Sequence, residues 1–215
     1  MEKIIQAFFE GFEMTPNNYL IFCVTFASFC FLFAGIIKKG GDNSQRALTW
    51  LMYCLLDSIL MFSVLKTTQK DGDGFAILFG SSICSFVMFI ILACQKKSKW
   101  GWLETTVAGL VFICIVVWIV KGPYESVRIG IISEIIVGTY LIIETVNSPR
   151  CNYYNIVGYL LFLLASIISV INAKDYSLPE YGYAFSEIVI TTATIIIPWL
   201  IHHQARRFKK KNGLY

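Results

Sequence analysis

Charge is scarce in this chain. Only 15% of its 215 residues are Asp, Glu, Lys or Arg, and 56% are hydrophobic, whereas a soluble domain carries about 25% charged residues. The charged residues gather in short segments between long apolar runs, and the mean hydropathy is +0.65. This pattern excludes a separate soluble domain and predicts an integral membrane protein with several crossings, whose first partner is the lipid bilayer.

Histidine is rarer still, and its scarcity excludes several enzymes. The two histidines, His202 and His203, are adjacent and would point apart on a helix, while a catalytic zinc needs about three protein ligands. No histidine lies inside an apolar run to act as the base for a serine. The runs hold one aspartate, Asp57, where an aspartyl protease needs two, and the last three runs hold no lysine for a retinal Schiff base. We therefore predict no enzyme, no metal and no cofactor.

The seven cysteines are scattered and form no Cys-x-x-Cys motif. They are interpreted as small apolar packing residues, and not as a disulfide or metal framework. The net charge of +4 comes from basic residues in loops and at the C-terminus. Because these residues form no basic face, no nucleic-acid partner is predicted.

Seven apolar runs of 18 to 20 residues remain. A helix rises about 1.5 Å per residue, so each run can cross about 30 Å of hydrocarbon. Nothing alternates as a barrel strand does. The sequence therefore predicts an all-α protein with seven transmembrane helices. The runs are 19–37, 48–65, 75–94, 103–120, 129–146, 154–171 and 183–201.

The first 17 residues differ from these runs. Ile4, Ile5, Phe8, Phe9 and Phe12 recur at helical spacing, with three glutamates off that stripe. This pattern predicts an amphipathic helix that lies at the membrane interface.

The loops predict the orientation. One side of the membrane receives twelve basic residues and the other receives six, so the richer side is expected in the cytoplasm. The N-terminus is then outside and the C-terminus inside. The twelve residues are Lys38, Lys39, Arg46, Lys96, Lys97, Lys99, Arg150, Arg206, Arg207, Lys209, Lys210 and Lys211.

An internal duplication is indicated by two similar tetrapeptides. Asn43-Ser44-Gln45-Arg46 and Asn147-Ser148-Pro149-Arg150 lie 104 residues apart, each after a long apolar run, and this offset places Trp50 on Tyr154. The seven runs then divide as 3+1+3, with segments 1–17, 18–95, 96–124, 125–203 and 204–215. The fourth run restores the direction of the chain, so the triplets are parallel repeats with a pathway between them. The alternative is seven unrelated helices.

This layout resembles the SWEET and PQ-loop transporters. The loop and helix at 43–57, with Thr49-Trp50 inside it, are also similar to small bacterial membrane proteins of PQ-loop type. The resemblance implies a bacterial inner-membrane carrier. In place of the Pro-Gln pair of that family the chain has Gln45-Arg46 and Pro149-Arg150. The resemblance therefore implies the 3+1+3 arrangement of helices but does not imply a sugar substrate.

Three carboxyl groups lie inside the apolar runs: Asp57, Glu134 and Glu187. Each costs about 2.5–3.5 kcal/mol at a helix centre, so a role is expected. Gly130, Glu134 and Gly138 form one helical stripe that permits close packing. Two further polar stripes, Ser81-Ser82-Ser85 and Glu187-Thr191-Thr194, should also face the interior.

These residues favour binding of a cation, a proton or an amine-bearing solute. The alternative is that each carboxyl is protonated and only hydrogen-bonds a neighbouring helix. Glu104 and Glu144, at the cytoplasmic edge, are expected to be solvated. The predicted substrate-binding residues are Glu134, Glu187, Asp57, Thr191, Ser82, Trp50 and Tyr154.

Two functions remain open. The first is a carrier of a small polar or cationic solute, in which Asp57 couples a proton and Trp50 and Tyr154 are aromatic walls or gates. Both aromatic residues could instead anchor the interface. The second is a membrane protein without transport: a homo-oligomeric pore, or a scaffold that recruits a cytoplasmic partner through Arg206–Lys211.

Overall fold

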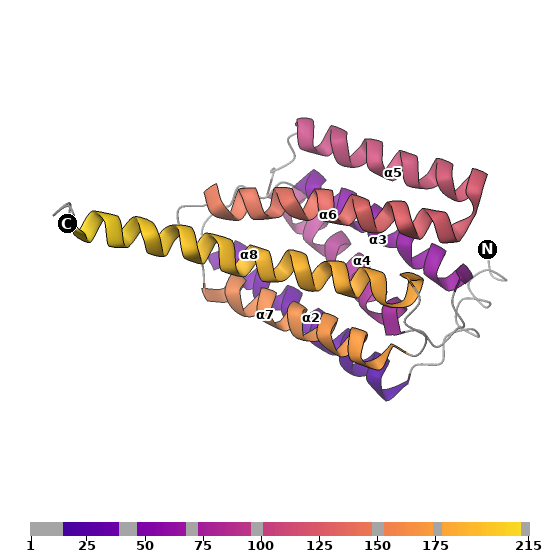
Figure 1. Cartoon of the computed structure of the whole chain (residues 1–215), viewed down its shortest axis with the longest axis horizontal. Coiled ribbons are helices and arrows are strands. Elements are labelled where there is room, and N and C mark those ends of the chain that lie inside the picture. Colours follow the sequence, from indigo (N-terminus) through magenta and orange to yellow (C-terminus); the bar gives the residue numbers. More distant parts are fainter. Residues whose placement is uncertain are drawn as a thin grey trace.

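A computed structural model describes residues 15–38, 47–67, 73–95, 101–147, 153–173 and 178–211. All regular structure in these ranges is helical, as predicted (Figure 1). The predicted N-terminal amphipathic helix falls almost wholly outside them. The helices are α2 (Pro16–Lys38), α3 (Ala47–Thr67), α4 (Asp73–Cys94), α5 (Trp102–Lys121), α6 (Pro123–Asn147), α7 (Tyr153–Asn172) and α8 (Leu178–Lys211).

Each of the seven apolar runs lies within one of these helices. Five of the helices, α2, α4, α5, α7 and α8, contain stretches of 18 to 20 residues that are long and apolar enough to cross a membrane. A shorter apolar stretch, Trp50–Val64, lies in α3. The chain is therefore an all-helical protein with the composition and helix lengths of an integral membrane protein.

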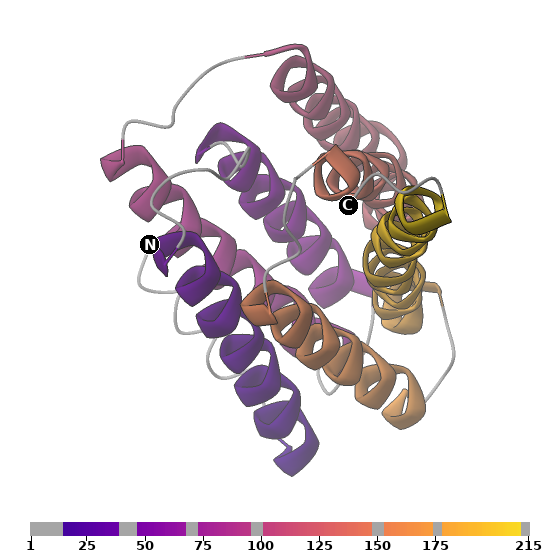
Figure 2. The ribbon, with the colours of Figure 1, turned by 90° about the vertical axis from the view of Figure 1, so that its left-hand side faces the viewer.

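Of the helices that the structure describes, six surround the interior and one lies outside them. α4 packs between α2 and α3, and α8 packs between α6 and α7. α2 also packs on α7, α3 on α6, and α4 on α8. Among the described elements, α5 contacts only α3 and α6, and Figure 2 shows it at the edge of the bundle beside α6.

Glycines allow the close helix contacts. A Cβ at Gly138 of α6 would lie 2.6 Å from Ile190 of α8, and one at Gly130 would overlap Leu60 of α3. The α2–α7 contact is similar, since the Ser28 hydroxyl donates a 2.8 Å hydrogen bond to the carbonyl of Gly158. Small residues let helix backbones approach in lipid, so the predicted stripe of Gly130 and Gly138 is a packing face.

The turn between α5 and α6 is a single residue. Gly122 has φ +94°, a conformation that favours glycine because it lacks a Cβ. Pro123 then begins α6, at the first helical position, where its missing N–H leaves no bond unmade. This turn places α5 against α6 and outside the six-helix ring.

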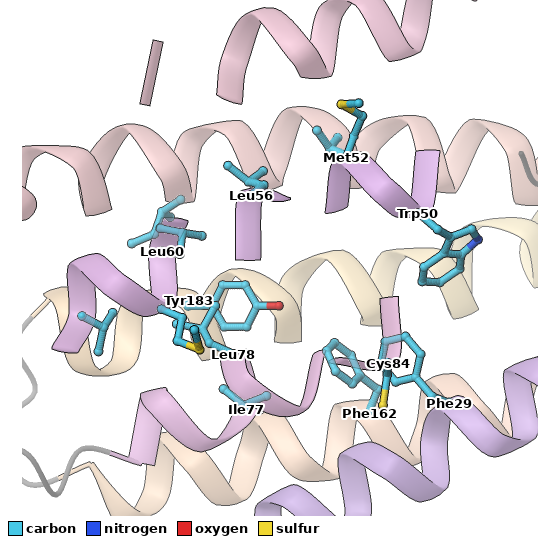
Figure 3. Close-up of a cluster of buried hydrophobic side chains, with 14 of the residues drawn as sticks. Phe29, Trp50, Met52, Leu56, Leu60, Ile77, Leu78, Cys84, Phe162 and Tyr183 are labelled. Atoms are coloured by element: carbon cyan, nitrogen blue, oxygen red, sulfur yellow. The ribbon is translucent and has the colours of Figure 1, made fainter. Parts of the chain in front are cut away.

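The buried core lies between α4 and its neighbours. Figure 3 shows Phe29, Trp50 and Phe162 together toward one end, with Tyr183, Leu78 and Leu60 toward the other. All six side chains are at most 9% exposed. The large exposed side chains lie on the outer faces of the bundle, as expected for helices in contact with lipid.

Two details differ from the sequence predictions. α8 has 34 residues and continues to Lys211, past the boundary predicted at residue 203, and Figure 1 shows its last turns projecting beyond the bundle. Glu104 is fully buried instead of solvated. It accepts a 2.8 Å hydrogen bond from the backbone N–H of Gly101, which satisfies a donor left free at the start of α5.

Candidate functional site

The site is built around the carboxyl group of Asp57, at the middle of α3 and 1% exposed. The Ser81 hydroxyl of α4 donates to its Oδ2 at 2.7 Å. The Tyr183 hydroxyl of α8 donates to its Oδ1 at 3.2 Å. Three helices are thus joined at one buried carboxyl group, whose desolvation these donors offset.

Glu134 of α6 adjoins this group. Its carboxyl and that of Asp57 are close enough to share a hydrogen bond, and two carboxyl groups can do so only with a proton on one of them. Glu134 is 1% exposed. No described residue donates a hydrogen bond to its Oε1. One buried oxygen is therefore left without a donor from the part of the chain that the structure describes.

Glu187 completes the cluster. It lies one helical turn after Tyr183 on α8, is 8% exposed, and is near enough to interact electrostatically with both Asp57 and Glu134. Thr191 follows one turn later on the same face. The three carboxyl groups come from α3, α6 and α8, so they meet only through the packing of the helices.

A cavity of about 60 Å³ opens beside these carboxyl groups. Its polar end is lined by Ser81, Ser85, Glu134, Tyr183, Glu187 and Thr191. No lysine, arginine or histidine is among the described residues that line it. The volume is enough for a few water molecules, and it is well below the roughly 150 Å³ that accommodates benzene. The cavity is therefore small, and its ionisable lining residues are acidic.

The rest of the lining is mainly aromatic. It comprises Phe29, Trp50, Tyr53, Tyr159 and Phe162, together with Leu32 and Ile190, and Figure 3 shows Phe29, Trp50 and Phe162 toward the other end of the core from Tyr183. The Phe29 ring meets Trp50 edge-on with centroids 5.8 Å apart, and it meets Phe162 at 6.0 Å. Edge-to-face pairs of this kind are attractive and hold the rings in place. The cavity thus joins a carboxyl-rich wall to an ordered aromatic one.

The structure brings together most of the predicted site residues. Glu134, Glu187, Thr191 and Trp50 line the cavity, and Asp57 is bonded to two of the lining residues. Trp50 is 9% exposed and meets the Phe29 ring, so its side chain lies in the interior of the bundle.

Two predicted residues lie elsewhere. Ser82 makes a 2.7 Å hydrogen bond with Ser58 of α3, so it joins α3 to α4 while Ser81 and Ser85 face the cavity. The whole serine stripe was expected to face the interior, but Ser81 and Ser82 point 100° apart on a helix. Tyr154 is half-buried near the start of α7 and does not line the cavity.

Sequence reasoning missed Tyr183 and, apart from Trp50, the other aromatic residues that line the cavity. Tyr183 carried a usable signal, because it precedes Glu187 by four residues and Thr191 by eight, and residues at this spacing share a helix face. Phe29, Tyr159 and Phe162 carried none, since the chain has 17 Phe and 11 Tyr. Only the packing of α2 and α7 selects them.

Within the described ranges, no cluster of three or more His, Cys, Asp or Glu side chains is placed to hold a metal ion. No protein-family model, curated protein or solved structure matches this chain.

Proposed function

We propose that this protein is a membrane carrier that exchanges a small cationic solute for protons. The observation that carries the proposal is a group of three buried carboxyl groups, from α3, α6 and α8. Two of them, Glu134 and Glu187, line a cavity whose described lining contains no basic residue, and Asp57 is bonded to Ser81 and Tyr183 of that lining. Acidic groups inside a membrane bundle are costly and usually mark ion, proton or solute pathways.

A 3+1+3 organisation belongs to this proposal, with α2–α4 and α6–α8 as the moving triplets and α5 as the linker. The contacts between helices support it. Exchanging α2 with α6, α3 with α7 and α4 with α8 converts every contact among these six helices into another contact that the structure has. Such an exchange is expected of two parallel repeats related by an axis along the membrane normal.

The proposed coupling uses the contact between the triplets. Asp57 belongs to the first triplet and Glu134 to the second, and a hydrogen bond between their carboxyl groups, which this proposal includes, requires a proton. An arriving cation can take the place of that proton between the two carboxyl groups. The hydrogen bond between Asp57 and Glu134 is then replaced by contacts of both carboxyl groups with the cation. If the two triplets rock about this site, the cavity opens to one side of the membrane and then to the other. The proposal includes a cytoplasmic C-terminus, which the distribution of basic residues in the sequence supports.

The experiment is proton flux in liposomes that contain the purified protein and an internal pH-sensitive dye. A panel of amines, amino acids, sugars and vitamins is added outside, and the flux of protein-free liposomes is subtracted. We expect at least one cationic solute to drive protons out, and neutral sugars to have no effect. Glu187→Gln should reduce this flux at least tenfold, because a cation then loses one carboxylate.

The control variant is Glu125→Gln. Glu125 is partly exposed near the start of α6, where its side chain, 44% exposed, pairs with Arg128 at 3.1 Å, and a pair near the surface contributes little. Its flux should equal that of the wild type. A folded protein that moves no solute would overturn the proposal. Ion currents without exchange would favour a pore, and a stable soluble partner would favour a scaffold.

A further inference from the structure

The aromatic end of the cavity has no role in proton exchange alone. We propose that the cavity recognises the ammonium group of a small organic amine, with the carboxyl wall binding the charged nitrogen and the aromatic wall enclosing its carbon atoms. This inference rests on the proposed function, because it names the class of solute that the carrier would move. It concerns binding alone, however, so it can be tested separately from transport.

The first argument is the unused oxygen of Glu134. Its Oε1 is buried and receives no hydrogen bond from any described residue. An ammonium group offers up to three N–H donors. With Glu187 on the same cavity wall, two carboxyl groups face one nitrogen, and hydrogen bonds between charged groups are short and strong.

The second argument is the composition of the other wall. Phe29, Trp50, Tyr53, Tyr159 and Phe162 surround that end, and aromatic faces attract organic cations, with tryptophan the most effective. Phe29, Trp50 and Phe162 offer no oxygen ligand to a metal ion such as Na⁺, so on this wall only the hydroxyl groups of Tyr53 and Tyr159 could serve one. An alkylammonium ion has one polar end and one apolar end, and so matches both walls.

The third argument is size. A cavity of about 60 Å³ is less than half of the roughly 150 Å³ that holds benzene. A sugar ring is larger than benzene and does not fit. Methylammonium and ethylammonium have one and two carbon atoms and are the matching probes.

The test is equilibrium binding of radiolabelled methylammonium to the detergent-purified protein in 100 mM NaCl. We expect saturable binding although sodium is in excess. Unlabelled ethylammonium should displace the label. Methanol, which has a similar size but no charge, should not. Displacement by a modest addition of NaCl, or equal displacement by methanol, would overturn the inference.

Variants test how much each wall of the cavity contributes to methylammonium binding. Glu187→Gln should weaken methylammonium binding at least tenfold, and Trp50→Leu should weaken it about fivefold. The matched control is Trp118→Leu, because Trp118 lies on α5 and is 39% exposed, away from the cavity. If Trp50→Leu is poorly folded, Phe162→Leu tests the same wall. Unchanged binding in folded aromatic variants would overturn the aromatic part of the site.

Failure of this inference differs from failure of the carrier proposal. If methylammonium binds as described but moves no protons in liposomes, the ammonium site stands and the carrier proposal fails. If another cation drives proton flux and methylammonium neither binds nor competes, the carrier proposal stands and the ammonium site fails.

Discussion

α4 and α5 are similar in sequence character and opposite in position. They have 22 and 20 residues, and their apolar stretches have mean hydropathies of 2.5 and 2.0. Yet 61% of the α4 stretch is buried within the protein and only 22% of the α5 stretch is. Hydropathy therefore identifies helices that suit lipid, but it does not place them in the bundle.

The difference lies in the small and polar residues. α4 carries Gly80, Ser81, Ser82 and Ser85, which are all buried, and it contacts α2, α3, α7 and α8. α5 instead exposes large apolar side chains such as Phe112, at 65%, and Ile119, at 71%. In lipid, small residues allow close packing and polar side chains form bonds between helices, so they mark the interior helix.

The two cavities beside these helices differ in the same way, because one is apolar and the other has polar groups. The groove between α3 and α5 has a volume of about 320 Å³ and is lined by Ile59, Phe62, Ile115 and Trp118. The central cavity, about 60 Å³, is smaller but has carboxyl groups. The larger space offers only apolar surface, as lipid does. The chemistry of the lining, and not its volume, identifies the candidate site.

The largest contrast is expected for Gly80→Leu and Gly109→Leu, the mid-helix glycines of α4 and α5. A Cβ at Gly80 would lie 3.0 Å from Thr25 of α2, whereas a Cβ at Gly109 would meet nothing within 4 Å. Gly80→Leu should cost about 3 kcal/mol of stability, the upper end for overpacking. Gly109→Leu should be neutral or stabilising, because glycine is a poor helix former. Thermal unfolding in one detergent measures both, and equal losses would contradict the assignment of the two helices.

The second contrast compares Leu92→Ala with Ile119→Ala. Leu92 of α4 is fully buried and Ile119 of α5 is 71% exposed. The first change should cost about 2 kcal/mol, near the lower end for a buried leucine, because in lipid the loss is mainly one of packing. The second should stay within about 0.5 kcal/mol, as surface changes do. The same thermal unfolding assay applies, and a larger loss at Ile119 would mean that another surface covers α5.

Much of the fold could be predicted because the bilayer sets helix lengths. The predicted run 75–94 differs from α4 by two residues at its start, and 103–120 differs from α5 by one residue at each end. Hydropathy failed at α8, where the helix continues to Lys211. Hydropathy indicates where the apolar, lipid-facing part of a helix ends. The helix itself can continue beyond that point into water.

The candidate site was only partly predictable. The cost of burying charge identified Asp57, Glu134 and Glu187, because an acidic residue in an apolar run needs a reason. Their meeting could not be predicted, since it depends on the rotation of α3, α6 and α8 about their axes. A rotation of one residue on α4 decides that Ser81 bonds Asp57 while Ser82 bonds Ser58.

The smallest contrast, Ser81→Ala against Thr106→Ala, tests that rotation directly. Ser81 donates to Asp57 across two helices at 2.7 Å, whereas Thr106 of α5 donates to the carbonyl of Trp102 in its own helix at 3.0 Å. Losing the bond between helices should cost about 1 kcal/mol, within the range measured in membrane proteins, and it should also slow solute-driven proton flux. Thr106→Ala should change neither. A flux loss in both variants would mean that the assay reports general stability. A loss confined to Ser81→Ala would show that this hydroxyl supports the proposed role of Asp57 in proton coupling.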